Sequence, residues 1–216
     1  MQGAALPRMQ STNEDDSLRG AAVGAQGLYD RQKVGLSNDC TENAMSQDPQ
    51  SAKPVPDEET IELATKLFNC ARIGDTETFR EYLPKGLPPN LCNQKGDSLV
   101  MLASYHGHVE TTRVLLEHGA DPEMRNDHGQ NPLAGAAYKG NLPMVKLLLA
   151  HGAKVDGCSP DGKTALMFAA MFNHVDIVDF LLANGANPQA TESRGMTARD
   201  LAQAMGAEDT AARLAS

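Results

Sequence analysis

Histidine and cysteine are the residues of this chain whose side chains could hold a metal ion or act as nucleophiles. The two closest histidines, His106 and His108, are two residues apart across an expected helix end, so their side chains diverge. The four cysteines, at positions 40, 70, 92 and 158, are far apart and form no Cys-x-x-Cys pair. Zinc sites use ligands at short, regular spacing, so the sequence predicts no metal site.

The carboxylates likewise lack the arrangement of an enzyme site. Asp and Glu are scattered along the chain without a nucleophile or base beside them. We therefore expect no catalysis and no cofactor.

Side chains suited to binding another protein occur as adjacent pairs at a spacing of 33 residues. The pairs are Tyr105-His106, Tyr138-Lys139 and Met171-Phe172. Tyrosine, methionine and phenylalanine are enriched at the cores of protein interfaces, so three such pairs side by side predict a binding patch. The alternative is that these rings pack onto neighbouring helices, with the phenylalanine the best candidate for packing.

The same spacing of 33 residues governs the glycines, and it predicts the elements that carry these pairs. Twelve of the nineteen glycines fall in three series: Gly96, Gly129, Gly162 and Gly195; Gly86, Gly119, Gly152 and Gly185; Gly74, Gly107, Gly140 and Gly206, with Asn173 in the remaining place. Glycine serves where the backbone needs a positive φ or a close approach, so the same turns must recur in each period.

Two helices are expected in each period. The first opens on a small polar residue that can cap it, at Ser98, Asn131 and Thr164. The second is an amphipathic run at residues 111–116, 144–149 and 177–182. Each run is closed by a glycine, and proline follows soon after Gly119 and Gly185. His118 and His151 precede the closing glycines, where a cation is favourable, so we predict that they cap the helix C-termini.

These motifs resemble the ankyrin repeat, whose signature combines Thr-Pro-Leu-His-x-Ala, a Gly-His turn, an Ile-Val-x-Leu-Leu-Leu helix and a Gly-Ala-Asp turn. The resemblance covers roughly residues 58 to 216 and implies an all-α solenoid of helix-turn-helix repeats with hairpin-like loops. The signature histidine is replaced by Met101, Ala134 and Met167, so its local hydrogen bonds should be absent.

The resemblance divides the chain into a cap at 58–90, repeats at 91–123, 124–156 and 157–189, and a cap at 190–216. Residues 1–57 are polar, without apolar periodicity, so we expect a disordered tail and linker. A translation start at Met45 is the alternative to a functional tail. Within the array, we expect Phe168 to fill the space that Gly135 leaves at the equivalent position one repeat earlier.

Net charge and hydropathy limit the classes of partner that the chain is expected to bind. The formal net charge is −9, which disfavours nucleic acids and anionic membranes, and no run of 18 apolar residues occurs. The four cysteines show no paired spacing, which fits a reducing compartment. We therefore expect a cytoplasmic protein, with the nucleus as a second location.

We therefore predict a protein–protein interaction module, monomeric when free, that binds another protein through a concave groove. The helix-end pairs form its centre, and the hairpin tips form a polar rim. The rim residues are Lys95, His128, Asp161 and Arg194. The alternative is a chaperone-like or inhibitory subunit that masks a basic segment of a single client.

Overall fold

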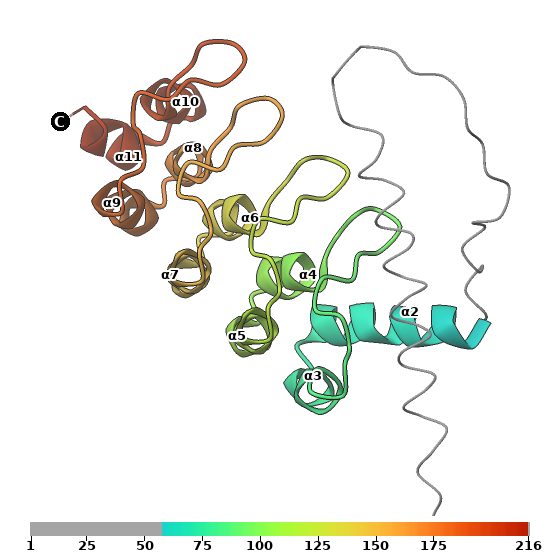
Figure 1. Cartoon of the computed structure of the whole chain (residues 1–216). Helices are drawn as coiled ribbons and strands as arrows, with labels where there is room; N and C mark the ends of the chain where they lie inside the picture. Colours follow the sequence, from blue (N-terminus) through green and yellow to red (C-terminus); the bar gives the residue numbers. More distant parts are fainter. Residues whose placement is uncertain (1–57, 216) are drawn as a thin grey trace, which may run out of the picture.

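The computed structural model describes residues 58–215, with side chains from residue 61 onward. Two parallel rows of helices stack along the molecule, and a long loop precedes each of the later inner helices (Figure 1). The inner row is α2 (Glu58–Ile73), α4 (Leu99–Tyr105), α6 (Pro132–Tyr138), α8 (Ala165–Met171) and α10 (Ala198–Met205). The outer row is α3 (Thr76–Tyr82), α5 (Val109–Glu117), α7 (Leu142–Ala150), α9 (Val175–Ala183) and α11 (Glu208–Arg213). Each helix packs against its partner in the other row and against the next helix of its own row.

The inner helices begin where the sequence predicts. The side chains of Ser98, Asn131 and Thr164 each accept a hydrogen bond from the backbone N–H three residues later. Thr197 does the same for α10, and the Asp200 carboxylate accepts in return from the Thr197 N–H, completing a capping box. These predicted helix starts are confirmed.

The recurring glycines occupy left-handed backbone. All twelve have positive φ, and Asn173, which takes the remaining place in the series, has φ 58°. At Gly140 the absence of a side chain also makes room for the next repeat, because a Cβ there would lie 2.6 Å from the His174 ring. The His174 Nε2 bonds the Tyr138 carbonyl oxygen at 3.2 Å, so the glycine admits a hydrogen bond between repeats.

Two of the outer helices, α5 and α7, end at the predicted histidines. His118 Nδ1 bonds the Val114 carbonyl oxygen at 2.8 Å, and His151 Nδ1 bonds the Leu147 carbonyl oxygen at 2.9 Å. Asn184 fills the same position in the next repeat and donates from Nδ2 to the Phe180 carbonyl oxygen at 2.8 Å. The predicted capping by both histidines is confirmed.

A single apolar core runs between the two rows of helices. Alanine dominates the inner helices at their contacts, and leucine, valine, isoleucine and methionine fill the outer side. Met101, Ala134 and Met167, at the position of the signature histidine, are all buried. Apolar packing thus replaces the hydrogen bonds that a histidine would make there.

The expectation about Gly135 is wrong. A Cβ built on Gly135 would meet the Tyr105 ring, with Cδ2 at 3.6 Å, and no atom of Phe168 lies within 4 Å of it. Phe168 instead lies edge-on to Tyr138, with ring centroids 6.5 Å apart. The position therefore faces the ring of the preceding repeat, not that of the following one. The predicted tail, the linker and Met45 lie outside the described residues.

Candidate protein-binding surface

Large exposed apolar side chains gather at one place in every helix pair, the C-terminal end of the inner helix. Among residues 61–215, six large apolar side chains are exposed, and five of them lie at these helix ends. They are Ile73 (71% exposed), Tyr105 (43%), Tyr138 (40%), Phe172 (38%) and Met205 (55%). We call these five residues the apolar strip.

Two members of the strip, Ile73 and Met205, escaped the sequence analysis. Counting in steps of 33 from Ile73 gives His106, Lys139, Phe172 and Met205, so the signal was present in the spacing. It was overlooked because both residues lie in the terminal repeats. The strip is thus longer than the three predicted pairs.

Aromatic contacts bind the centre of the strip together. Tyr138 and Phe172 meet edge to face, with ring centroids 4.6 Å apart and planes at 77°. The Lys139 ammonium lies over the Tyr105 ring, 4.5 Å from its centroid, and 5.9 Å from the Tyr138 centroid. Both distances are within the range of cation–π attraction. The centre of the strip is therefore a connected cluster across three repeats.

The remaining helix-end residues frame this cluster. His106 is exposed, and its ring lies edge-on to Tyr105 at 5.8 Å and stacks with His108 at 6.4 Å. Met171 is half-buried against the core. Since the three aromatic rings of the strip are about two-fifths exposed, each packs on one side and faces solvent on the other.

The backbone beneath the cluster is already satisfied. At the end of α6, the carbonyl oxygens of Gly135, Ala136 and Ala137 accept from the N–H groups of the three residues that follow the helix. The Tyr138 carbonyl oxygen bonds His174. A partner at this place would therefore meet side chains and not open carbonyl groups.

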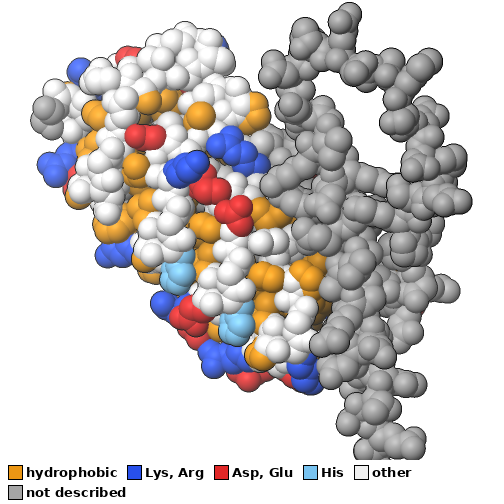
Figure 2. Space-filling model, in the orientation of Figure 1, with side chains coloured by type: hydrophobic (Ala, Val, Ile, Leu, Met, Phe, Trp, Pro, Cys, Tyr) orange, Lys and Arg blue, Asp and Glu red, His pale blue; other side chains and the backbone are white. Residues whose placement is uncertain are grey.

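The hairpin tips form a separate set of loops. Lys95, His128 and Arg194 are exposed, whereas Asp161 is half-buried. The Arg194 Nε donates to the buried Glu192 at 3.3 Å, which leaves Arg194 partly engaged. On the face shown in Figure 2, acidic and basic side chains are interspersed and not sorted by sign.

Asp161 is held inside its own tip. Its carboxylate accepts from the Lys163 ammonium and from the Ser159 hydroxyl. These hydrogen bonds, that of Lys163 first, lower the pKa of Asp161 to about 2. The charge of Asp161, unlike that of a free surface carboxylate, thus stabilises its own loop.

Neighbouring tips are joined by backbone hydrogen bonds, with one interruption. The Asp127 N–H donates to the Lys95 carbonyl oxygen at 3.0 Å, and the Ser193 N–H donates to the Asp161 carbonyl oxygen at 2.8 Å. The equivalent residue between them is Pro160, which has no N–H to donate. The tips therefore pair as first with second and third with fourth.

Other kinds of site find little support in the part of the chain that the structure describes. It holds no group of three His, Cys, Asp or Glu side chains placed to bind a metal ion, and none of its helices is long and apolar enough to cross a membrane. Burial raises the pKa of the Cys70 thiol, which makes it a poorer nucleophile.

Comparison with known proteins agrees with this architecture. Models of ankyrin repeats match residues 67–157, 133–182 and 166–212, which together span most of the array. A protein of Pseudomonas aeruginosa named for its ankyrin repeats is 55% identical over 58 residues, 27% of this chain and 34% of that protein. The match thus spans about a third of that relative's length.

Ankyrin repeats are in general protein–protein interaction modules, and proteins built from them are typically not enzymes. The stacked helix pairs, the left-handed glycines at fixed positions and the matches to the repeat models agree with one another. The chain belongs to the ankyrin repeat family.

Proposed function

We propose that this protein binds a partner protein through the apolar strip, with the hairpin tips as a polar rim and without catalysis. The observation that carries the proposal is the repetition: the exposed large apolar side chains occupy equivalent helix ends in five consecutive helix pairs. Scattered exposed apolar residues are ordinary on a protein surface, but neighbouring ones, such as Tyr138 and Phe172 in contact here, are typical of an interaction site.

The chemistry of the strip suits an interface core. Tyrosine contributes a large contact area and a hydroxyl at low conformational cost, and aromatic residues dominate the energetics of interfaces. The edge-to-face contact of Tyr138 with Phe172 and the cation above Tyr105 limit the motion of these rings. A rigid surface loses less entropy on binding, so affinity per contact is higher.

The alternative, in which the protein masks a basic segment of one client, draws on the net charge of −9. Such a segment would need carboxylates to receive it at the strip. The sequences of α4, α6 and α8 contain no Asp or Glu. A basic client would therefore find no carboxylate on the three central inner helices.

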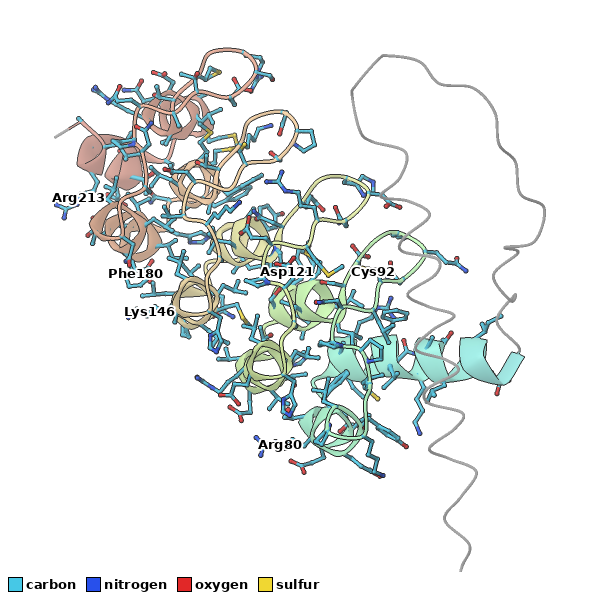
Figure 3. All side chains as sticks on the ribbon, viewed as in Figure 1. Arg80, Cys92, Asp121, Lys146, Phe180 and Arg213 are labelled. Carbon is cyan, nitrogen blue, oxygen red and sulfur yellow. The ribbon has the colours of Figure 1, made fainter. Side chains whose placement is uncertain are left out.

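The test is to replace the central tyrosines by alanine and measure binding to peptides selected from a displayed library by the full chain. Tyr105→Ala and Tyr138→Ala should each weaken binding by more than about 1 kcal/mol, about fivefold in Kd, because each ring is an interface anchor. Phe180→Ala, an aromatic ring of the outer row (Figure 3), and Lys154→Ala should leave binding unchanged.

Urea unfolding of the same variants separates binding from packing. If the tyrosine variants unfold at much lower urea while their folded fraction binds as wild type does, the rings are core residues and the proposal fails. In that case the tip residues Lys95, His128, Asp161 and Arg194 become the candidates.

A further inference from the structure

We infer that the partner presents a carboxylate, from Asp or Glu, flanked by apolar side chains, and that this carboxylate pairs with Lys139 at the centre of the strip. The inference rests on the proposed function, since it describes the ligand of the same surface. The net charge of −9 alone would suggest a basic partner, whereas the partner inferred here is acidic.

The formal charge at the centre of the strip, on α4, α6, α8 and the residue after each, is that of Lys139 alone. The helices α4, α6 and α8 contain no charged residue of either sign, so the polar character there comes from the residues that follow each helix. Those residues are His106 and Lys139, which are polar, and Phe172, which is not. At the first repeat, Arg72 stands beside Ile73 in the last turn of α2. An acidic protein thus carries a local apolar surface with a lysine at its centre.

Lys139 differs from the arginines that reach across to a neighbouring helix. On the outer row, Arg80 pairs with Glu110 at 2.5 Å and Arg213 pairs with Asp179. These pairs lie on the side away from the inner helices (Figure 3). Within residues 61–215, no carboxylate forms an ion pair with Lys139, which has the ring faces of Tyr105 and Tyr138 as neighbours.

The two tyrosine rings hold the Lys139 ammonium in position and leave its hydrogen-bond donors available. A cation–π contact is electrostatic attraction to a ring face, whereas a lysine ammonium has three N–H donors. Rings on its flanks reduce the side-chain entropy that an ion pair would otherwise cost. A carboxylate that docks here also loses water to the neighbouring apolar surface, which strengthens the attraction.

The surroundings of Lys139 set what must accompany the carboxylate. Tyr138 and Phe172 lie on one side of it in the stack, and Tyr105 and Ile73 lie on the other. An anion alone would leave these side chains in water. A peptide segment with apolar residues before and after an acidic residue covers both sides, and so matches the strip in charge and in hydrophobicity.

The test is selection from a library of short random peptides displayed without modification, using the full chain. Wild type should enrich peptides that carry Asp or Glu between apolar residues. Lys139→Glu should abolish that preference and enrich Lys or Arg instead. Lys146→Glu is the matched control, because Lys146 also lies over an aromatic ring of the next helix, 5.4 Å from the Phe180 centroid, but on the outer row. It should select as wild type does.

A double-mutant cycle then measures the pair itself. For a selected peptide, replacing its acidic residue by the matching amide should weaken binding to wild type about fivefold or more, and should change little for Lys139→Met. Equal losses for both proteins would show that the carboxylate binds elsewhere.

The possible failures are distinct. If wild type enriches apolar or basic peptides without acidic residues, or yields no peptides, the inference is overturned. If in addition Tyr138→Ala abolishes selection of the apolar peptides, the proposed binding strip stands and only its charge preference is refuted. If the tyrosine variants select the same peptides as wild type, the strip itself is not the site.

Discussion

Gly135 lies inside α6, at a position that faces Tyr105 of the preceding repeat. Glycine inside a helix costs about 1 kcal/mol relative to alanine, and a Cβ here would meet Tyr105 Cδ2 at 3.6 Å, an ordinary contact distance. We therefore expect Gly135→Ala to raise the free energy of unfolding by up to about 1 kcal/mol in urea titrations.

Gly152→Ala gives the matched comparison. Gly152 has φ +92° and no neighbouring heavy atom within 4 Å of a built Cβ, so the change there tests the backbone alone. It should lower the free energy of unfolding by about 1–2 kcal/mol, the usual cost of left-handed backbone for a residue with a side chain. A loss of stability in Gly135→Ala would mean that Tyr105 cannot accommodate the methyl group.

Asp161 should contribute to the acid sensitivity of the array. Its pKa falls from 3.8 to about 2 in the folded chain, chiefly through the Lys163 ammonium. A lowered folded pKa means that the group stabilises the fold above pH 3.8 and that this stabilisation is lost as pH falls towards 2. Asp161→Asn should therefore flatten the dependence of the unfolding free energy on pH in this range.

The effect should be modest, because solvent reaches the carboxylate and weakens the interaction. Lys163→Met should flatten the same range, since it removes the main partner. If Asp161→Asn retains the full wild-type slope, the acid sensitivity arises from other carboxylates.

At the scale of the element, the start of α6 carries the clearest defect. The Asn131 side chain caps the helix by accepting from the Ala134 N–H at 2.8 Å. Its Nδ2 is the one buried side-chain nitrogen or oxygen without a hydrogen-bond partner among the described residues. A buried unsatisfied donor costs roughly 1–3 kcal/mol.

Serine should cap α6 without this cost. Ser98 occupies the equivalent position one repeat earlier and accepts from the Met101 N–H at 3.1 Å. We expect Asn131→Ser to raise the free energy of unfolding by about 1 kcal/mol, because it keeps the acceptor and removes the donor. Asn131→Ala, which loses both, should fall about 1 kcal/mol below Asn131→Ser. A destabilised serine variant would indicate that Nδ2 is satisfied by water.

At the scale of the whole molecule, net charge and local charge oppose each other. The chain carries −9, whereas the centre of the strip carries Lys139. Long-range repulsion should slow the approach of an acidic peptide, and salt screens it over a Debye length of about 10 Å at 0.1 M. The association rate constant of a selected acidic peptide should therefore rise as ionic strength increases, measured by stopped-flow fluorescence.

A basic client would show the opposite trend. Its association would slow with added salt, because the attraction to the acidic array would be screened. The sign of the salt dependence thus separates the two proposed kinds of partner without a structure of the complex.

The amino-acid sequence was sufficient to predict the repeat, its turns and its helix starts. These depend on local backbone requirements: left-handed φ at the recurring glycines, and a side-chain acceptor at Ser98 and its equivalents. A local requirement that recurs at constant spacing can be recognised without knowing what packs against it. Fold class and helix capping follow from it.

The contacts of each side chain in the strip depend on how the repeats pack, and the sequence did not predict them. Lys139 lies over Tyr105 of the preceding repeat, and Tyr105, not Phe168, faces Gly135. Which neighbour a ring leans towards depends on the offset between stacked repeats, which no local pattern encodes. The partial exposure of the rings has the same origin, because it depends on how much of each ring the neighbouring repeats cover.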